Sequence, residues 1–289
     1  MGTSQRHSPS VTGQPNWGKS SVSLTAAIKN LEKLEEIIPD NNNDQRSDLA
    51  DQIQNLSQSM RYTYADKQTQ KISNSFSRNV RNSVKRLIKA SGGKKNVSVG
   101  KSRALGQAGI AVLGNFINTV LEIQQDGLDG WLKNKGITLE GKKREDIFNI
   151  LIEACSDKVI GLDETAANQA ITEMFEGLKD MMNETFSNIE ETLQSILNDQ
   201  QLQEIIDKFF GVYIFVHLSQ NFTEKLEKKY TQEKVDQYMK QIKEQIISDI
   251  QEGIHGSKSI NVDWNGVEGK KFISEEFNKI LNIFDNDED

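Results

Sequence analysis

The chain has 289 residues, of which 36% are hydrophobic and 7% aromatic, and a formal net charge of −7. This length allows one large domain or two small ones, and the low content of aromatic residues and proline is typical of a mostly helical protein. No segment reaches 18 apolar residues and Cys155 is the single cysteine, so we expect no membrane span, no intrachain disulfide and a cytoplasmic location.

Residues 1–21 are predicted to form a flexible, disordered tail, because Ser, Thr, Gly, Gln and Asn dominate and no apolar period is present. Gly2 is small enough for Met1 to be removed, which would expose an α-amine. Such an amine has a pKa of about 8, against about 10.4 for lysine, so roughly a hundredfold more of it is neutral and nucleophilic at pH 7. N-myristoylation is not expected, because Arg6 stands where that motif requires Ser or Thr.

The residues from Gly13 to Ser20 match the phosphate-loop pattern G-x-x-x-x-G-K-[ST]. A phosphate loop also needs a buried strand in front of it, and residues 5–12 contain a single aliphatic side chain and a proline. We therefore expect a turn that leads into a helix. A phosphate-loop enzyme that depends on Lys19 remains a third functional hypothesis.

Apolar residues that recur every three or four positions predict a series of helices along the rest of the chain. The predicted helices cover residues 22–38, 47–60, 65–90, 104–123, 142–155, 163–182, 184–197, 200–219 and 223–253, with a last helix from Ser274. A linker-like turn region is expected at 127–141, and a short extended piece at 260–264. The prediction is an all-α, multi-helix bundle-like fold with room for a minor β element near the C-terminus. We divide it into the tail (1–21), N-terminal helices that include a basic one (22–103) and an acidic helical core region (104–289).

Several positions in these helices carry specific expectations. Small residues from Gly106 to Gly114 predict a tightly packed helix, since glycine inside a helix costs up to about 1 kcal/mol relative to alanine. Residues 209–218 are apolar nearly all round and should be buried, with His217 as a core imidazole. Cys155 is expected to be a buried helix residue. Asp163 is expected to start a helix and to accept hydrogen bonds from that helix's own first-turn N–H groups.

No pattern in the sequence indicates catalysis. The three histidines are too dispersed for a metal site, and the acidic pairs lie at helical spacing on polar faces. We therefore expect no enzyme activity, no metal and no cofactor.

The charge is distributed very unevenly along the chain. Residues 61–103 hold twelve Lys or Arg and one acidic residue, Asp66, so the remainder sums to −18. Charge blocks of opposite sign and of this size bear on which partners the protein binds, and they do not determine its fold. The candidate contacts on the basic helix, for nucleic acid or for a partner protein, are Arg78, Arg81, Lys85, Arg86 and Lys89. A merely solvated face is the remaining interpretation.

Four segments of the chain form a further pattern: Met1-Gly2-Thr3-Ser4, the small-residue helix from Gly106 to Gly114, the segment from Leu162 to Ala170, and the segment from Trp264 to Gly269. Together they resemble the QatB family of the bacterial Qat anti-phage operon. The operon also encodes an ATPase, a QueC-like enzyme and a TatD-like nuclease, which the resemblance implies as partners.

The resemblance implies a non-enzymatic partner or substrate protein for the QueC-like enzyme, which belongs to a class that activates a deazaguanine carboxylate with ATP. The Gly2 amine would attack that carboxylate and form an amide. From their backbone and hydroxyl groups, we infer that Thr3 and Ser4 are recognition residues. The alternative function is a nucleic-acid-binding adaptor that uses the basic helix within residues 65–103.

Overall fold

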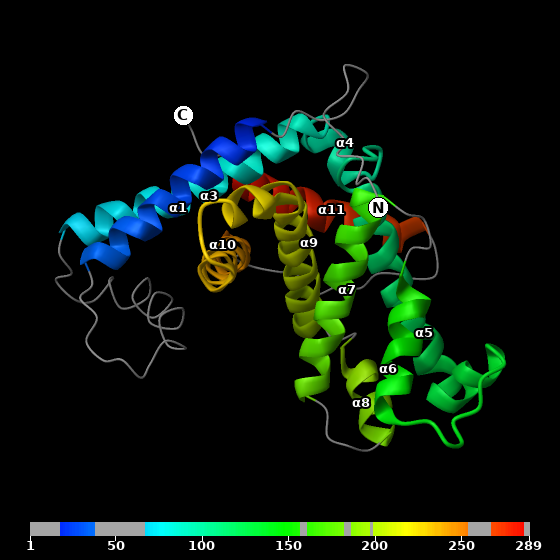
Figure 1. Cartoon of the computed structure of the whole chain (residues 1–289). Helices are drawn as coiled ribbons and strands as arrows, with labels where there is room; N and C mark the ends of the chain where they lie inside the picture. The colour runs from blue at the N-terminus through cyan, green and yellow to red at the C-terminus, as the bar shows by residue number, and fades with distance from the viewer. Residues whose placement is uncertain are drawn as a thin grey trace, which may run out of the picture. The chain divides into compact units, whose positions relative to one another are not determined.

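The structure is a computed structural model that describes residues 18–37, 67–156, 161–181, 186–196, 199–253 and 267–285. Within these residues every regular element is an α-helix, which confirms the all-α prediction (Figure 1). The helix expected at 47–60 and the extended piece expected at 260–264 lie outside the described residues. The described chain divides into two compact units.

Unit 1 consists of residues 1–90 and 218–248. Its described part contains α1 (Gly18–Ile37), α3 (Lys67–Ala90), the end of α9 (Asp199–Glu227) and most of α10 (Gln232–Gly253). Helices α1 and α3 lie side by side over much of their length (Figure 1). Their shared core consists of fully buried aliphatic and aromatic side chains at helical spacing: Leu24, Ala27, Ile28, Leu31, Phe76, Val80, Val84 and Leu87. Helix α1 begins four residues before its predicted start at 22, because Ser20 and Ser21 are already buried.

Unit 2 consists of residues 91–217 and 249–289. Its described helices are α4 (Lys94–Ser98), α5 (Gln107–Asn134), α6 (Arg144–Cys155), α7 (Leu162–Met181), α8 (Phe186–Ser195), the first part of α9 and α11 (Val267–Asp285). Aromatic rings join these helices in the core. Phe116 packs edge-to-face on Phe175 with ring centroids 5.6 Å apart, and Phe210 stacks on Phe277 at 4.0 Å.

Three further predicted helix boundaries are wrong. Helix α5 continues to Asn134 across a kink at Gly127 (φ 71°), so the first half of the expected turn region is helical and Trp131 is buried in the core. The predicted break at 220–222 is absent, since the buried Phe222 continues the apolar face of α9 to Glu227. Helix α11 begins at Val267, seven residues before Ser274.

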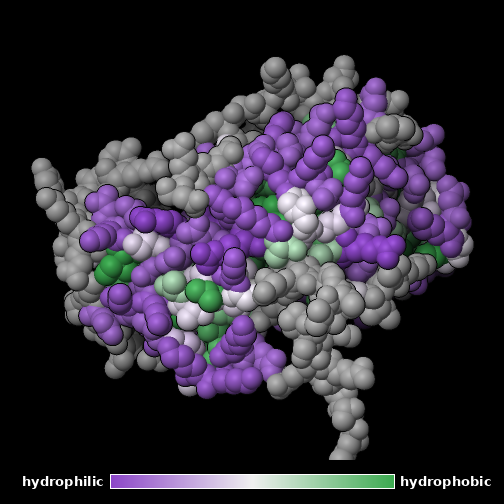
Figure 2. Space-filling model, turned by 90° about the horizontal axis from the view of Figure 1, so that it is seen from above, coloured by the Kyte–Doolittle hydropathy of each residue, from purple (hydrophilic) through white to green (hydrophobic). Residues whose placement is uncertain are grey.

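The burial predictions for the helix interiors are confirmed. Every residue from Phe209 to Leu218 is buried, and so is Cys155. Outside the core, hydrophilic side chains predominate on the face drawn in Figure 2, and hydrophobic ones occupy small separate areas. Among the described helices, none combines the length and the apolar character needed to cross a membrane.

Candidate functional site

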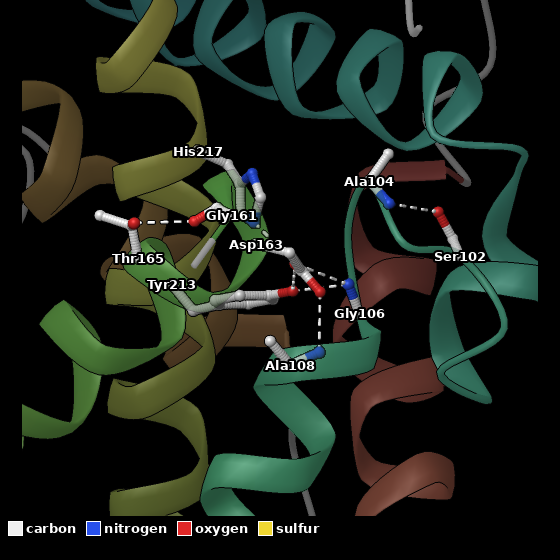
Figure 3. Close-up of polar contacts among 9 residues, drawn as sticks. All are labelled: Ser102, Ala104, Gly106, Ala108, Gly161, Asp163, Thr165, Tyr213 and His217. Carbon is white, nitrogen blue, oxygen red and sulfur yellow. Dashed lines mark hydrogen bonds and ion pairs between the residues drawn. The ribbon is translucent and has the colours of Figure 1, made fainter. Parts of the chain in front are cut away.

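A buried polar cluster lies where three helices of unit 2 meet (Figure 3). Its members are Asp163 of α7, Tyr213 and His217 of α9, and the backbone N–H groups of Gly106 and Ala108 at the start of α5. We call these five residues the Asp163 cluster. All three of its side chains are at most 1% exposed.

The carboxylate of Asp163 is the centre of this cluster. Its Oδ2 accepts a hydrogen bond from the Ala108 N–H at 2.7 Å, and its Oδ1 accepts one from the Gly106 N–H at 3.2 Å. Oδ1 also accepts from the Tyr213 hydroxyl and lies 2.9 Å from Nε2 of His217. Because α5 has no side-chain cap of its own, Asp163 supplies both the missing acceptors and a negative charge at the positive end of the helix dipole.

These contacts correct one prediction and confirm another. Asp163 does lie at the start of a helix, but its carboxylate caps α5 and not its own helix α7, so the expectation of a local cap is wrong. His217 is a hydrogen-bonded core imidazole, as expected.

Two glycines allow the helices to approach this closely. A Cβ atom on Gly109 would lie 2.8 Å from the ring of Tyr213, and one on Gly106 would lie 2.2 Å from the carbonyl oxygen of Val97. Gly106 also has φ +113°, a conformation that L side chains rarely adopt. The predicted close packing of the small-residue helix is therefore confirmed.

The Asp163 cluster has the chemistry of a structural network. Burial raises the pKa of Tyr213 well above its usual value of 10, and the charge of Asp163 adds to this, so the phenol stays protonated and remains a donor at neutral pH. Its three side chains have almost no contact with solvent. The cluster thus joins α5, α7 and α9, and it does not present a reacting group to a ligand.

An open groove of about 800 Å³ runs along the outer face of α5, beside the first turns of α11. The wall that α5 contributes is uncharged over about three turns, from Gln107 to Asn118. Beyond it, Glu122 and Lys270 add one charge of each sign. Glu122 is held in place by the indole N–H of Trp131 at 2.9 Å. The remaining lining residues are small, apolar or amide side chains: Val99, Gly100, Ile110, Ala111, Gly114, Asn115, Ile117, Gly269 and Ile273.

The five predicted contact residues of the basic helix differ in their exposure to solvent and in their contacts. Arg78 and Lys89 are exposed, and Arg81 and Lys85 are half-buried. Arg86 turns inward and donates hydrogen bonds to a backbone carbonyl and a serine hydroxyl of α1, at 2.9 and 2.6 Å. Arg86 therefore belongs to the packing of α1 against α3.

Comparison with known proteins gives one assignment. The family model described as "QatB: Qat anti-phage system associated protein QatB" matches residues 92–284, which is more than half of the chain. The chain belongs to the QatB family. No curated protein and no solved structure matches the chain.

The part of the chain that matches the QatB model contains the Asp163 cluster and the groove along α5. Three of the four resembling segments, from Gly106, Leu162 and Trp264 onward, also lie within it. The basic helix α3 precedes it. The predicted modification site Gly2 and its predicted recognition residues Thr3 and Ser4 lie outside both the matched span and the described residues.

The QatB-family protein uses the end of its phosphate-loop-like motif for helix packing. Gly18, Lys19 and Ser20 form the first residues of α1. The Ser20 hydroxyl, which would bind Mg²⁺ in a phosphate loop, lies 2.9 Å from the Ser83 carbonyl oxygen and 2.8 Å from the Ser83 hydroxyl. This geometry argues against the phosphate-loop hypothesis. No group of three or more His, Cys, Asp or Glu side chains within the described ranges could hold a metal ion.

Cys155 is expected to be unreactive in the folded protein. Burial raises the pKa of its thiol to about 12, while a hydrogen bond with Thr119 opposes the shift only in part. Since the thiolate is the reacting form, alkylation by iodoacetamide at pH 8 should be at least about a hundredfold slower in the native protein than in urea. Equal rates in the two states would show that Cys155 is accessible.

Proposed function

We propose that this QatB-family protein is a non-enzymatic, cytoplasmic component of its anti-phage system and the protein substrate of a QueC-like enzyme. In this proposal the enzyme activates a deazaguanine carboxylate with ATP, and the neutral amine of Gly2 attacks the activated carbon. A C–N amide bond forms, the activating group leaves, and the amine gives up a proton. Membership of the QatB family is the observation that carries the proposal.

The chemistry of the first residues supports Gly2 as the acceptor. Once Met1 is removed, Gly2 presents an α-amine without a side chain, which can enter a narrow pocket. Its pKa of about 8 makes it a better nucleophile at neutral pH than any lysine of the chain with an ordinary pKa near 10.4. Thr3 and Ser4 add backbone and hydroxyl groups that an enzyme could recognise. The ATPase and the TatD-like nuclease of the operon are the further partners that we propose.

The described structure supports a role as a partner protein. The Asp163 cluster is buried away from solvent and joins three helices. The open groove of unit 2 is lined mainly by amide, small and apolar side chains, with Glu122 and Lys270 as one charged residue of each sign, and this lining suits contact with a partner.

The test is the intact mass of the protein purified from cells that express the whole operon, followed by sequencing of its N-terminal peptide. We expect a deazaguanine adduct on Gly2, and its loss when the QueC-like enzyme is inactivated. Gly2→Leu should retain Met1, carry no adduct and fail to protect against phage, although it folds normally. Gly2→Ala is the matched control, since Met1 is still removed and a free α-amine remains. Full protection by Gly2→Leu would refute the proposal.

A further inference from the structure

Helix α3 carries seven basic residues and no acidic residue among its 24 residues. The described part of unit 1 (18–37, 67–90 and 218–248) contains sixteen basic and eight acidic residues, although the whole chain has a net charge of −7. The excess of positive charge in unit 1 therefore comes almost entirely from α3. An isolated concentration of charge of this kind is the electrostatic footprint expected for binding a polyanion.

Four of these basic residues form one line, which we call the basic stripe: Lys71, Arg78, Lys85 and Lys89. Their spacing of seven, seven and four residues keeps them on one face of the helix, over a length of about 27 Å. The apolar residues Phe76, Val80, Val84 and Leu87 are buried in the core of unit 1. Lys71, Arg78 and Lys89 are exposed, and Lys85 is half-buried.

Two of the three acidic side chains of the neighbouring helix α1 contact residues outside α3. Glu32 accepts a hydrogen bond from the Tyr230 hydroxyl at 2.7 Å, and Glu35 pairs with Lys234 at 3.1 Å. These contacts hold both carboxylates against α10 and the loop that precedes it. Glu36, which is exposed near the end of α1, is the remaining acid of that helix.

The residues beside the basic stripe distinguish between classes of partner. A protein interface is usually built around buried aromatic or aliphatic anchors, and single-stranded nucleic acid is usually held by stacking on exposed aromatic rings. Phe76, the one aromatic residue of α3, is 4% exposed and belongs to the core. The side chains beside the stripe are Asn74, Ser75 and Asn82, which can donate hydrogen bonds to phosphate oxygens but offer no anchor.

We propose that the basic stripe of α3 binds the phosphate backbone of double-stranded DNA without sequence preference. The line of four cations follows a line of phosphates, and affinity comes from the release of condensed counterions. This proposal uses none of the residues of the proposed N-terminal modification, so the two proposals can be tested independently.

The test is fluorescence anisotropy of the full-length protein with a labelled 30-base-pair DNA duplex of random sequence, over a range of salt concentrations. Four phosphate contacts predict that log K falls with log[salt] with a slope of about −3 to −4. Replacement of all four stripe residues by Gln should weaken binding at least about tenfold at low salt and should flatten the slope. The single variant Arg78→Gln should reduce the slope by about 1.

The matched control also removes four positive charges, but at exposed lysines that each pair with an acid four residues away in the chain. These are Lys133, Lys228, Lys240 and Lys271, which pair with Asp129, Glu224, Glu244 and Glu275. This variant should bind the duplex nearly as well as the unmodified protein. Equal weakening by both variants, or no weakening by the stripe variant, would overturn the proposal. So would tighter binding to the single strand or to polyglutamate than to the duplex. Circular dichroism verifies that each variant is folded.

Discussion

Replacement of Asp163 by alanine is expected to lower the free energy of unfolding by about 3 to 5 kcal/mol. The carboxylate accepts hydrogen bonds from the N–H groups of Gly106 and Ala108 and from the hydroxyl of Tyr213. Alanine would leave the Ala108 N–H and the Tyr213 hydroxyl without this acceptor, and the Gly106 N–H would keep only the Tyr213 hydroxyl oxygen. It would also remove the negative charge from the start of α5, which has no cap of its own. Urea unfolding followed by far-UV circular dichroism measures the change.

Three further variants determine the source of this stability. Asp163→Asn keeps the shape and one acceptor oxygen and should therefore lose less than alanine. Tyr213→Phe removes the hydrogen bond to Asp163 and one of the two acceptors of the Gly106 N–H, and should cost about 1 to 2 kcal/mol. Asp126→Ala removes an exposed carboxylate that also accepts a side-chain hydrogen bond, from Asn134, and should change stability by no more than about 0.5 kcal/mol. If Asp163→Ala unfolds at the same urea concentration as Asp126→Ala, the Asp163 cluster does not stabilise unit 2.

The periodicity of apolar residues was sufficient to place most helices, because each packs one face against a core. It worked best for α3, where apolar and basic residues lie on opposite faces. It failed at helix ends. Gly127 breaks the geometry of α5, yet Leu128 and Trp131 continue to be buried beyond it, so the glycine marks a kink and not an end. A local signal for a turn cannot show that tertiary packing carries the helix further.

The Asp163 cluster could not be assembled from the sequence. Asp163 has the position of a helix cap, but its partners on α5 and α9 lie 50 to 57 residues away in the chain. The same limit applies to the basic helix. Charge and spacing grouped Arg86 with Arg78, whereas the contact of Arg86 with α1 depends on how two separate helices pack.

The sequence contains a sign of the groove along α5 that our predictions did not use. The face that includes Gln107, Ala111, Gly114, Asn115 and Asn118 is exposed or half-buried, yet it contains no charge in a chain that is 27% charged. Solvent-facing positions of a helix normally carry charged residues, so an uncharged exposed face is informative. The small residues of α5 were interpreted only as core packing, which is correct for Gly109 and incomplete for Gly114.

The free energy of unfolding is also expected to depend strongly on pH, because of Asp207 of α9. Asp207 is 6% exposed and accepts a hydrogen bond from Gln203 at 2.8 Å. Burial raises the pKa of its carboxyl from 3.8 to about 7, and the nearby charge of Glu276 adds to the rise, while Gln203 and Lys279 oppose it. The folded protein therefore binds this proton more tightly than the unfolded chain does.

The sign of the effect follows from this difference. The stabilising contribution of the protonated Asp207 is complete below pH 4 and is lost as the pH rises through 7, so the free energy of unfolding should fall by up to about 4 kcal/mol over that range. Asp207→Asn cannot ionise and should be relatively more stable than the unmodified protein at pH 8, with the advantage vanishing near pH 4. Urea titrations at both pH values measure this difference.

The chain provides a matched control for burial. Asp236 accepts the same kind of hydrogen bond, from Gln232 one turn earlier and also at 2.8 Å, but it is exposed on α10. Asp207→Asn and Asp236→Asn make the same chemical change in the same local arrangement. A pH-dependent gain that occurs only in Asp207→Asn would therefore arise from the site between α9 and α11, where the carboxylate is buried and lies near the charge of Glu276. An equal effect in both variants would show that burial of Asp207 does not control the stability of unit 2 near neutral pH.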